Sequence, residues 1–488
     1  MTESWFEMTM KGLVRNFPPL ELLSSQQIET LHRATLDVLE NTGVVFDHER
    51  ALNLLADHGC TVDFDKKLVK IPGYLVEQSL RYCPSSFSVK ARDSKHDLRI
   101  GANTTYFITF CGLKTLDLDT WESRTATTQE LNDAVRILDG LEHIHLHDYG
   151  PYFELEGISP AMVMPTAFAG QLRNSSKITY SGYKQDSELF AIEMAKVAGT
   201  EVLGSIMDAA PLMYQHEALE ATFRFIEAGW PMKVNSSGVF GGTHPATLAG
   251  SLIAINATEM AAIVLIQAVK RGTGITVLHF SFPMDMRTGQ LAFGGIESYL
   301  QQVAFNQMWR HYGVPTFNST IISSSKLIDY QCGYEKAIGT IMAVLSGGNV
   351  VQGAGGVYGE VTYHPVMTVI DDDIYGMVGH FVRGMGITDH TMATELIHEI
   401  GPLPGSYLGT AHTRSEWRKE SFIPRVADRL SYSDWMRQGK KTVLTNARER
   451  AAHILATHKV TPLSEYQDRE IDRILESARR HYEAKGLI

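Results

Sequence analysis

The chain has 488 residues, of which 44% are hydrophobic and 20% charged, and its formal net charge is −11. Length and composition predict a globular protein with one large domain and additions, or with two to three domains. The acidic balance, without any block of Lys or Arg, argues against nucleic acid and anionic membranes as partners. We expect a cytoplasmic protein, because neither a signal-peptide core nor a run of roughly 20 apolar residues stands out. The four cysteines form no CxxC motif and should be reduced.

The first 105 residues predict an extension of mixed α and β structure. Ser24 is placed as an N-cap ahead of a helical pattern over 28–43, which stops at a glycine. A second helix is expected over 48–59 and a third over 72–82, with short strands around them.

The region that follows alternates between strand and helix patterns. Residues 106–118 alternate like a β-hairpin, and eight β/α units follow between about 140 and 413. We expect the first strand at 143–150 and the last at 406–413. Eight such units fit an α/β fold of the (β/α)₈ TIM-barrel type, with an open doubly wound sheet as the alternative. No GxGxxG or GxxxxGK[ST] motif follows an early strand, so nucleotide binding has no support.

These patterns divide the chain into three parts. We expect the extension over 1–105, the catalytic barrel over 106–423 and a charged helical tail over 424–488. The tail is expected to wrap the outside or to mediate self-association, which makes a homo-oligomer the expected assembly.

One β-α-β unit, at 315–358, combines the barrel pattern with polar loops. Its strands are expected over 316–322 and 349–352, with a helix over 331–345 between them. Ser, Asp, Gln and Gly follow the strands, and these are residue types of a site rather than of a core.

Catalytic residues of a barrel cluster at the carboxyl ends of its strands. That rule selects Asp148, Tyr149, Tyr180, Tyr183, Asn235, Ser237, His279, Phe280, Asn318, Ser323 to Ser325, Gln352 and His412. The set contains no lysine placed as a Schiff-base former and no GxSxG nucleophile elbow. Aromatic and neutral polar groups dominate it.

Three histidines raise the question of a metal. His143, His145 and His147 alternate along one expected strand, so their side chains share a face. Two of them could bind zinc if further ligands joined from other strands. Alternate residues also span the whole length of a strand, however, and structural roles are the favoured interpretation.

Two other patterns allow a functional or a structural interpretation. Residues 235–238 could cradle an anion with backbone amides, or could form a tight turn that needs glycine. Aromatic residues near the expected mouth could form a cation box, although core packing is the commoner role of any single ring. Gln352 stands in a glycine-rich loop, where its amide could donate to a carboxylate.

At this point the chain resembles the trimethylamine methyltransferase superfamily over nearly its whole length. Residues 23–46 resemble the family's opening helix, and residues 235–269 resemble its Ser-Gly, Thr-x-x-Gly and Glu stretch. The segment SSSKLIDYQCGYE is similar to its central motif, here Ser324, Lys326, Asp329, Gln331 and Glu335. The segment GTAHTRSEWRKESFIPRVADRLSYSDW looks like its C-terminal motif, here His412, Thr413, Arg418, Pro424, Asp428, Arg429 and Trp435.

The resemblance implies a (β/α)₈ barrel that presents a substrate methyl group to a cob(I)alamin-type corrinoid on a partner protein. The chain has only standard residues, so it resembles the branch without pyrrolysine, which includes glycine betaine methyltransferase. The implied cofactor is the partner's corrinoid, with no metal of the chain's own. The resemblance implies catalytic roles for Asp329, Gln331 and Glu335. Substrate contacts are expected from Gln352, Tyr358, Phe280, His279, Asn235 and Tyr149.

The chemistry agrees with this interpretation. A quaternary ammonium leaves as a neutral tertiary amine, so no general acid is needed, and the enzyme has to orient one methyl group and strip water from the cation. We therefore expect methyl transfer from a betaine to the corrinoid protein. The alternatives are a metal-dependent barrel hydrolase that uses His145 and His147, and a non-catalytic binder of quaternary amines.

Overall fold

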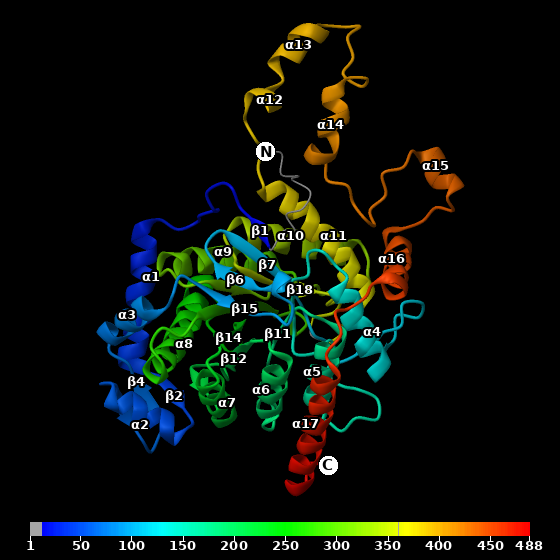
Figure 1. Cartoon of the computed structure of the whole chain (residues 1–488). Helices are drawn as coiled ribbons and strands as arrows, with labels where there is room; N and C mark the ends of the chain where they lie inside the picture. The colour runs from blue at the N-terminus through cyan, green and yellow to red at the C-terminus, as the bar shows by residue number, and fades with distance from the viewer. Residues whose placement is uncertain (1–11, 360) are drawn as a thin grey trace.

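The computed structural model describes residues 12–359 and 361–488 and contains a closed barrel of eight parallel strands (Figure 1). The barrel order is β7-β10-β11-β12-β14-β15-β17-β18, and β18 pairs with β7 to close it. The strands are β7 (Thr104–Thr109), β10 (Leu146–His147), β11 (Ile178–Tyr180), β12 (Val202–Met207), β14 (Met232–Phe240), β15 (Ile275–Asp285), β17 (Thr316–Asn318) and β18 (Val350–Ala354). The predicted (β/α)₈ class is confirmed, and the open sheet is excluded.

Each barrel strand is followed by a helix of the outer layer. These helices are α4 (Thr128–Asp139), α5 (Val163–Asn174), α6 (Ser187–Ala198), α7 (His216–Glu227), α8 (Leu248–Val269), α9 (Ile296–His311), α10 (Tyr330–Leu345) and α11 (Pro365–Val382). Side chains alternate between the lumen and this helical layer. Ile108, Leu146, Ile178 and Leu278 meet in the lumen, so the barrel is packed rather than open.

The sequence prediction misplaced the first and last barrel strands. The expected hairpin at 106–118 is wrong, because β7 pairs in parallel with β10 and β18 and its residues are buried on both faces. The expected strand at 406–413 is also wrong. Thr410 instead caps α14 (Ala411–Glu420), far from the barrel sheet, so His412 is not at a strand end. The barrel therefore begins one β/α unit earlier in the chain than the sequence predicted, with β7, and ends one unit earlier, with β18 and α11.

The N-terminal extension packs on one side of the barrel and covers the end at which the amino termini of the barrel strands lie. Its helical elements are α1 (Ser25–Asp37), the π-turn η1 (Val38–Thr42), α2 (Glu49–Asp57), α3 (Gly73–Tyr82) and η2 (Ser94–His96). Its strands are β1 (Leu13–Val14), β2 (Val44–Phe46), β3 (Thr61–Asp63), β4 (Leu68–Lys70), β5 (Ser86–Val89) and β6 (Leu98–Gly101). The β5–β6 hairpin contributes Val89 and Ile100 to the cluster that fills the lumen, so it closes the end opposite the carboxyl termini of the strands. Strand β2 pairs with β13 (Met213–Tyr214) of the barrel region, which ties the extension to the β12–α7 connection.

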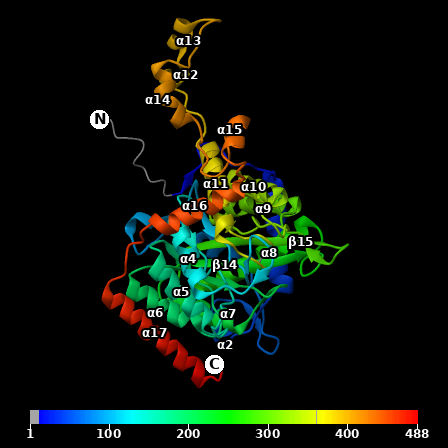
Figure 2. The same cartoon turned by 90° about the vertical axis from the view of Figure 1, so that its right-hand side faces the viewer.

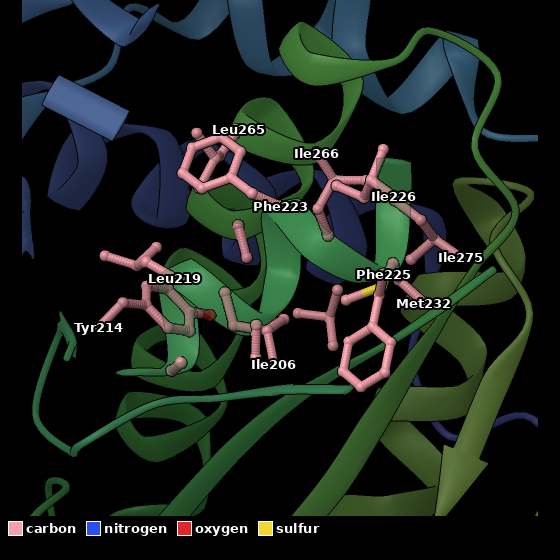
Figure 3. Packing of buried hydrophobic residues seen from close by; sticks show 14 of the residues in the cluster. Ile206, Tyr214, Leu219, Phe223, Phe225, Ile226, Met232, Leu265, Ile266 and Ile275 are labelled. Carbon is pink, nitrogen blue, oxygen red and sulfur yellow. The ribbon is translucent and has the colours of Figure 1, made fainter. Parts of the chain in front are cut away.

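Helix α8 is apolar over its whole circumference because it is covered on two sides. It lies between the barrel strands β14 and β15 and the helices α1, α2 and α3 of the extension. Figure 3 shows part of this core, where Leu265 and Ile266 of α8 lie near Phe223 of α7 and Ile275 of β15. By length and composition α8 is long and apolar enough to cross a membrane, but 78% of its most apolar window is buried inside the protein.

The segment after α11 leaves the barrel as an arm and then returns (Figures 1 and 2). The arm holds α12 (Asp389–Met392), α13 (Thr394–Ile400), α14 and α15 (Tyr432–Arg437), and none of these helices buries a residue. The chain returns as α16 (Val443–Thr457) and α17 (Glu465–Ala484), which pack against α4 and α11 and against α5 and α6. The remaining strands are β8 (Thr115–Leu116), β9 (Ser123–Arg124) and β16 (Gln290–Leu291).

A fully buried ion pair fixes the glycine-rich connection after β18. The Lys336 ammonium lies 2.8 Å from the Asp371 carboxylate, and both side chains are completely buried. Lys336 also donates to the carbonyls of Gly353 and Gly356, and Asp371 accepts from the amide of Gly355. A Cβ at Gly353 would lie 2.1 Å from a backbone oxygen, so the loop is held too closely for a side chain there.

We expect Lys336→Met to lower the free energy of unfolding by about 3–5 kcal/mol, because Asp371 is then a buried charge without its cation. Urea denaturation measures the change. The double variant Lys336→Met/Asp371→Asn removes both charges and keeps an acceptor for Gly355, so it should be more stable than the single variant. A double variant that is less stable would show that the charge of Asp371 is not the cause.

Candidate functional site

A cavity of about 660 Å³ opens at the carboxyl ends of β10, β11 and β12, where barrel enzymes hold their active sites. Its lining is largely apolar, with four aromatic rings, two methionines and a few polar groups. The residues are Leu113, Thr125, Tyr149, Phe153, Glu154, Leu155, Ile158, Pro160, Val163, Met164, Tyr180, Gly182, Tyr183, Lys184, Ser205 and Met207.

The four rings of the cavity come from two neighbouring β/α connections. The ring centroid of Tyr149 lies 5.0 Å from that of Phe153 and 5.5 Å from that of Tyr180. The Tyr180 hydroxyl donates to Ser205 Oγ at 2.7 Å, which fixes its ring. The Tyr183 hydroxyl accepts a hydrogen bond from the backbone amide of Met207, the last residue of β12. Both tyrosines are therefore oriented by the adjacent strand, and the rings present π-surface to one shared space.

The cavity carries one side chain of each charge at its rim. Glu154 and Lys184 both line it and both are exposed. Within residues 12–359 and 361–488, neither side chain has an ion-pair partner within 4 Å. An exposed carboxylate and an exposed ammonium are thus available to a molecule that enters.

Beneath the rings lies a buried polar layer that crosses the barrel lumen. The Gln352 amide donates to the Asp148 carboxylate and to the carbonyl of Thr109, and its oxygen accepts from Ser319 Oγ at 2.7 Å. These contacts join β10, β17, β18 and β7. Gln352 is therefore committed to protein partners on both sides of its amide.

Two charged groups of this layer have displaced pKa values. Burial raises the pKa of Asp148 to about 6, against the opposing effects of Lys233 and of hydrogen bonds from Tyr149 and Gln352. Burial lowers the pKa of Lys233 to about 8, and Asp148 opposes that shift. Between these values both groups are charged and compensate each other across the lumen.

The substrate contacts expected from the sequence are only partly brought together. Tyr149 lines the cavity, and Asn235 lies in the lumen near it, where its amide donates to Ser205 Oγ at 3.2 Å. His279 faces the helical layer instead: its Nε2 lies 2.8 Å from Gln301 of α9, and burial lowers its pKa to about 4. That position gives His279 a packing role.

Phe280 and Tyr358 lie elsewhere around the mouth. Phe280 belongs to a second aromatic cluster, with ring centroids 5.0 Å from Phe282 and 6.4 Å from Phe110. The Lys326 ammonium lies over the ring of Tyr358, 4.3 Å from its centroid. Strand β15, which carries Phe280, lies across the barrel from β10, so this cluster is separate from the cavity.

The three residues expected to be catalytic form a brace for the loop after β17. Glu335 accepts from Ser323 Oγ at 2.5 Å and from the amide of Ser324 at 3.0 Å, and Gln331 donates to its other oxygen at 2.9 Å. Asp329 caps α10 by accepting from the backbone of its third residue. These contacts set the loop's position, across the barrel from the cavity on β11.

The alternating histidines point away from the lumen, each toward a different protein partner. His143 lies 3.4 Å from the Asp372 carboxylate, His145 Nδ1 accepts from the amide of Phe107, and His147 Nε2 lies 2.6 Å from Ser175 Oγ. Burial lowers the pKa of His145 and of His147 to about 3. Over the described part of the chain, no three His, Cys, Asp or Glu side chains are grouped so that they could hold a metal ion.

The anion cradle considered at 235–238 is occupied by the protein's own carboxylate. Asp208 accepts from the Ser236 hydroxyl at 2.9 Å and from the amide and hydroxyl of Ser237 at 2.9 and 3.2 Å. The tight turn is also absent, because β14 continues through Gly238 to Phe240. Gly238 is needed for another reason: a Cβ there would lie 1.9 Å from the imidazole of His244.

Sequence reasoning overlooked Glu154, Lys184 and Lys233. The two rim residues lie in loops, where charged side chains are common and carry no signal. Lys233 did carry one, because a lysine two residues before Asn235 in an apolar strand must share its lumen face. Tyr180 and Tyr183 were selected as strand-end residues, and both line the cavity.

Comparisons with known proteins agree with the barrel fold. The family model "Trimethylamine methyltransferase (MTTB)" matches residues 1–484. A trimethylamine methyltransferase MttB of Desulfitobacterium hafniense is 27% identical over 95% of both chains. A glycine betaine methyltransferase from another strain of that species is 29% identical over 94% of this chain and 96% of that one. The crystal structure of the Methanosarcina barkeri monomethylamine methyltransferase superposes with a TM-score of 0.53 at 10% identity, over 98% of this chain and 90% of that one.

Fold and site together define a (β/α)₈-barrel enzyme whose apolar, aromatic cavity lies at the carboxyl ends of the strands. With a family model matched from residue 1 to residue 484, the chain belongs to the trimethylamine methyltransferase family, and it is a methyltransferase.

We expect Gln352→Leu to lower the free energy of unfolding by about 1–3 kcal/mol, because Asp148 and Ser319 lose a buried partner. The folded-state pKa of Asp148, about 6, lies above the ordinary 3.8, so the stability that it contributes is full below pH 4 and is lost as the pH rises through 6. The variant should raise this pKa further, since the lost donor favoured the charged form. Unfolding measured at pH 5 and pH 8 should therefore show the larger deficit at pH 8, and equal deficits would contradict the assignment.

Proposed function

We propose that this methyltransferase moves a methyl group from a quaternary amine, glycine betaine or a related betaine, to the Co(I) corrinoid of a partner protein. The observation that carries the proposal is the cavity lined by Tyr149, Phe153, Tyr180 and Tyr183. Membership of a family named for methylated-amine chemistry supports it, as does the relative named as a glycine betaine methyltransferase.

The rings suit a quaternary ammonium because such a cation has no N–H to donate. Its charge is spread over methyl groups, and the negative face of an aromatic ring attracts it by about 0.5–2 kcal/mol per ring. Trimethylamine in its protonated form carries an N–H that needs an acceptor, whereas the rings offer none, so the cavity favours the quaternary form. Met164 and Met207 add polarizable surface that adapts to methyl groups.

The rim charges suit the other half of a betaine. A carboxylate that projects from the aromatic end can pair with the Lys184 ammonium, while Glu154 adds a negative charge for the cation. Lys184 thereby takes the carboxylate contact that the sequence suggested for Gln352. Gln352 and His279 are engaged with protein groups, and Asn235 lies below the cavity next to Ser205.

Within the reaction, the chain has to desolvate the cation and hold one methyl group toward the mouth. The rings exclude water from the ammonium, and the carboxylate contact sets the direction of the C–N bond to be broken. The partner's corrinoid supplies the Co(I) electron pair that forms the new bond to carbon. The amine nitrogen keeps the pair of the broken C–N bond and leaves neutral, so no side chain has to supply a proton.

The rim offers an apolar surface for a flat macrocycle. Leu113 and Met207 line the cavity and are 43% and 42% exposed, so their side chains lie at its edge and also form part of the outer surface. A corrinoid on a partner protein can cover these side chains without entering the cavity. The metal-dependent hydrolase has no comparable support, because His145 and His147 face the helical layer.

We expect the protein, a competent corrinoid protein in the Co(I) state and glycine betaine to yield a methylated corrinoid and dimethylglycine. The loss of the Co(I) absorbance and the appearance of the amine product measure the transfer. Proline betaine, carnitine and butyrobetaine complete the panel. Failure of all four with a Co(I) protein of proven competence would contradict the proposal, and tight binding without transfer would instead identify a binder.

We expect Lys184→Met to weaken the binding of glycine betaine and to leave that of tetramethylammonium nearly unchanged. The methionine side chain is similar in shape, one atom shorter, and lacks the charge that pairs with a carboxylate. Tyr180→Leu should weaken both ligands, by about 0.5–2 kcal/mol. Calorimetric titration of each ligand checks the pattern; equal losses for both ligands in Lys184→Met would exclude a carboxylate contact.

A further inference from the structure

Lys233 is a buried cation that shares an aromatic ring with the cavity. Its Nζ lies 3.7 Å from the ring centroid of Tyr180 and 4.6 Å from that of Phe317. Tyr180 lines the cavity, and Lys233 is only 3% exposed. One ring therefore contacts a protein cation in the lumen and is also available to a cation in the cavity.

We propose that Lys233 tunes the affinity of the cavity for cations: its protonated form opposes binding, and its neutral form permits tight binding. The inference rests on the proposed function only in taking the cavity as the cation site. It assigns Lys233 as a positioning residue that acts through Tyr180, without contact to the substrate.

The physical reason is the electrostatics of two like charges near one ring. An ammonium on Tyr180 polarises its π-electrons and lowers the attraction that the ring offers to a second cation. The two cations also repel each other directly, and the packed lumen screens this repulsion less than water does. Removing the proton from Lys233 ends both effects.

The surroundings of Lys233 determine the pH at which its ammonium loses a proton. The titratable groups that face it are Asp148 of the β10 end, Cys111 after β7 and Tyr180 of β11. The residues paired with it on the flanking strands, Ser205 of β12 and Thr276 of β15, carry no charge. Burial lowers the pKa of Lys233 to about 8, so the ammonium is lost within a readily accessible range.

Linkage makes the effect reciprocal. If the loss of a proton from Lys233 strengthens cation binding, then cation binding must lower the Lys233 pKa and release a proton. Near pH 8 this release is a measurable fraction of a proton. Above pH 10 it should vanish, because Lys233 is then neutral before the ligand arrives.

Tetramethylammonium chloride is the probe, because it has no carboxylate and needs no corrinoid. We expect its affinity for the full chain to rise about tenfold between pH 7 and pH 9.5, the order of magnitude for two like charges within one protein at a high effective dielectric constant. Calorimetry at pH 8 in buffers of different ionisation enthalpy counts the protons released. Ionic strength is held constant throughout.

Two variants isolate Lys233. Asp148→Asn removes the carboxylate that supports the ammonium, so proton release should persist and move to lower pH. Lys233→Met/Asp148→Asn leaves neither charge, so release should be lost and the affinity should not change with pH. Lys177→Met is the matched control: Lys177 is also buried, with a pKa lowered to about 8, but it donates to carbonyls of Leu138 and Leu141 away from the cavity.

The outcomes separate the two proposals. Binding of tetramethylammonium with no pH dependence would overturn the role of Lys233 and leave the cation site standing. Equal proton release in Asp148→Asn and the double variant at every pH from about 5 to 9.5 would do the same. The absence of binding at every pH would overturn the cation site itself, and the role of Lys233 with it. Proton release in the wild type does not depend on whether any variant folds.

Discussion

The contact between the Lys336 ammonium and the Asp371 carboxylate holds the barrel's last connection in place. The two side chains come from α10 and α11, and between them they bind the backbone of the loop that leaves β18. Strand β18 is also the strand that closes the barrel onto β7. A movement of this loop would separate the pair. Since a buried charge without a partner is strongly unfavourable, the pair holds the loop in place. Gln352, on the same strand, thereby keeps its place in the lumen.

The polar groups of the barrel fall into two sets. One set bonds within the protein, and the other lines the cavity. Asp148, Gln352 and Ser319 are hydrogen-bonded to one another, and the Lys233 ammonium lies over the ring of Tyr180. These groups form the floor of the cavity. The cavity above it keeps the rings and two exposed charges for a small molecule. The shape of the cavity does not depend on a ligand, because hydrogen bonds between β12 and the hydroxyls of Tyr180 and Tyr183 hold two of the rings in place.

Much of the fold could be read from the sequence, since β/α alternation is a regular signal and seven of the eight expected strands lie in the barrel. The first strand was missed because β7 is buried on both faces and its polar neighbours suggested a hairpin. The segment 406–413 imitated a strand by its residue types, yet no strand lies beside it. Local pattern cannot reveal pairing, which depends on residues distant in sequence.

The site was less predictable than the fold, and the reason is the direction of side chains. The strand-end rule found Tyr149, Tyr180 and Tyr183, but it could not tell that His279 faces α9 or that Phe280 lies across the mouth. A shift of one residue along a strand exchanges lumen and helical layer. The motif residues Asp329, Gln331 and Glu335 were easy to recognise, and the structure shows contacts that shape a loop. Lys184 and Glu154 became visible only when the loops were placed around the cavity.

The position of α8 has a consequence for the order in which the chain can fold. Helices α1 to α3 cover α8, yet about 170 residues of sequence separate α3 from it. During synthesis the extension is complete long before its partner leaves the ribosome, so its apolar faces stay uncovered while five barrel strands are made. Contacts of such sequence separation form slowly, because a long loop must close before they contribute. The extension therefore joins the protein late, although it is the part that is made first.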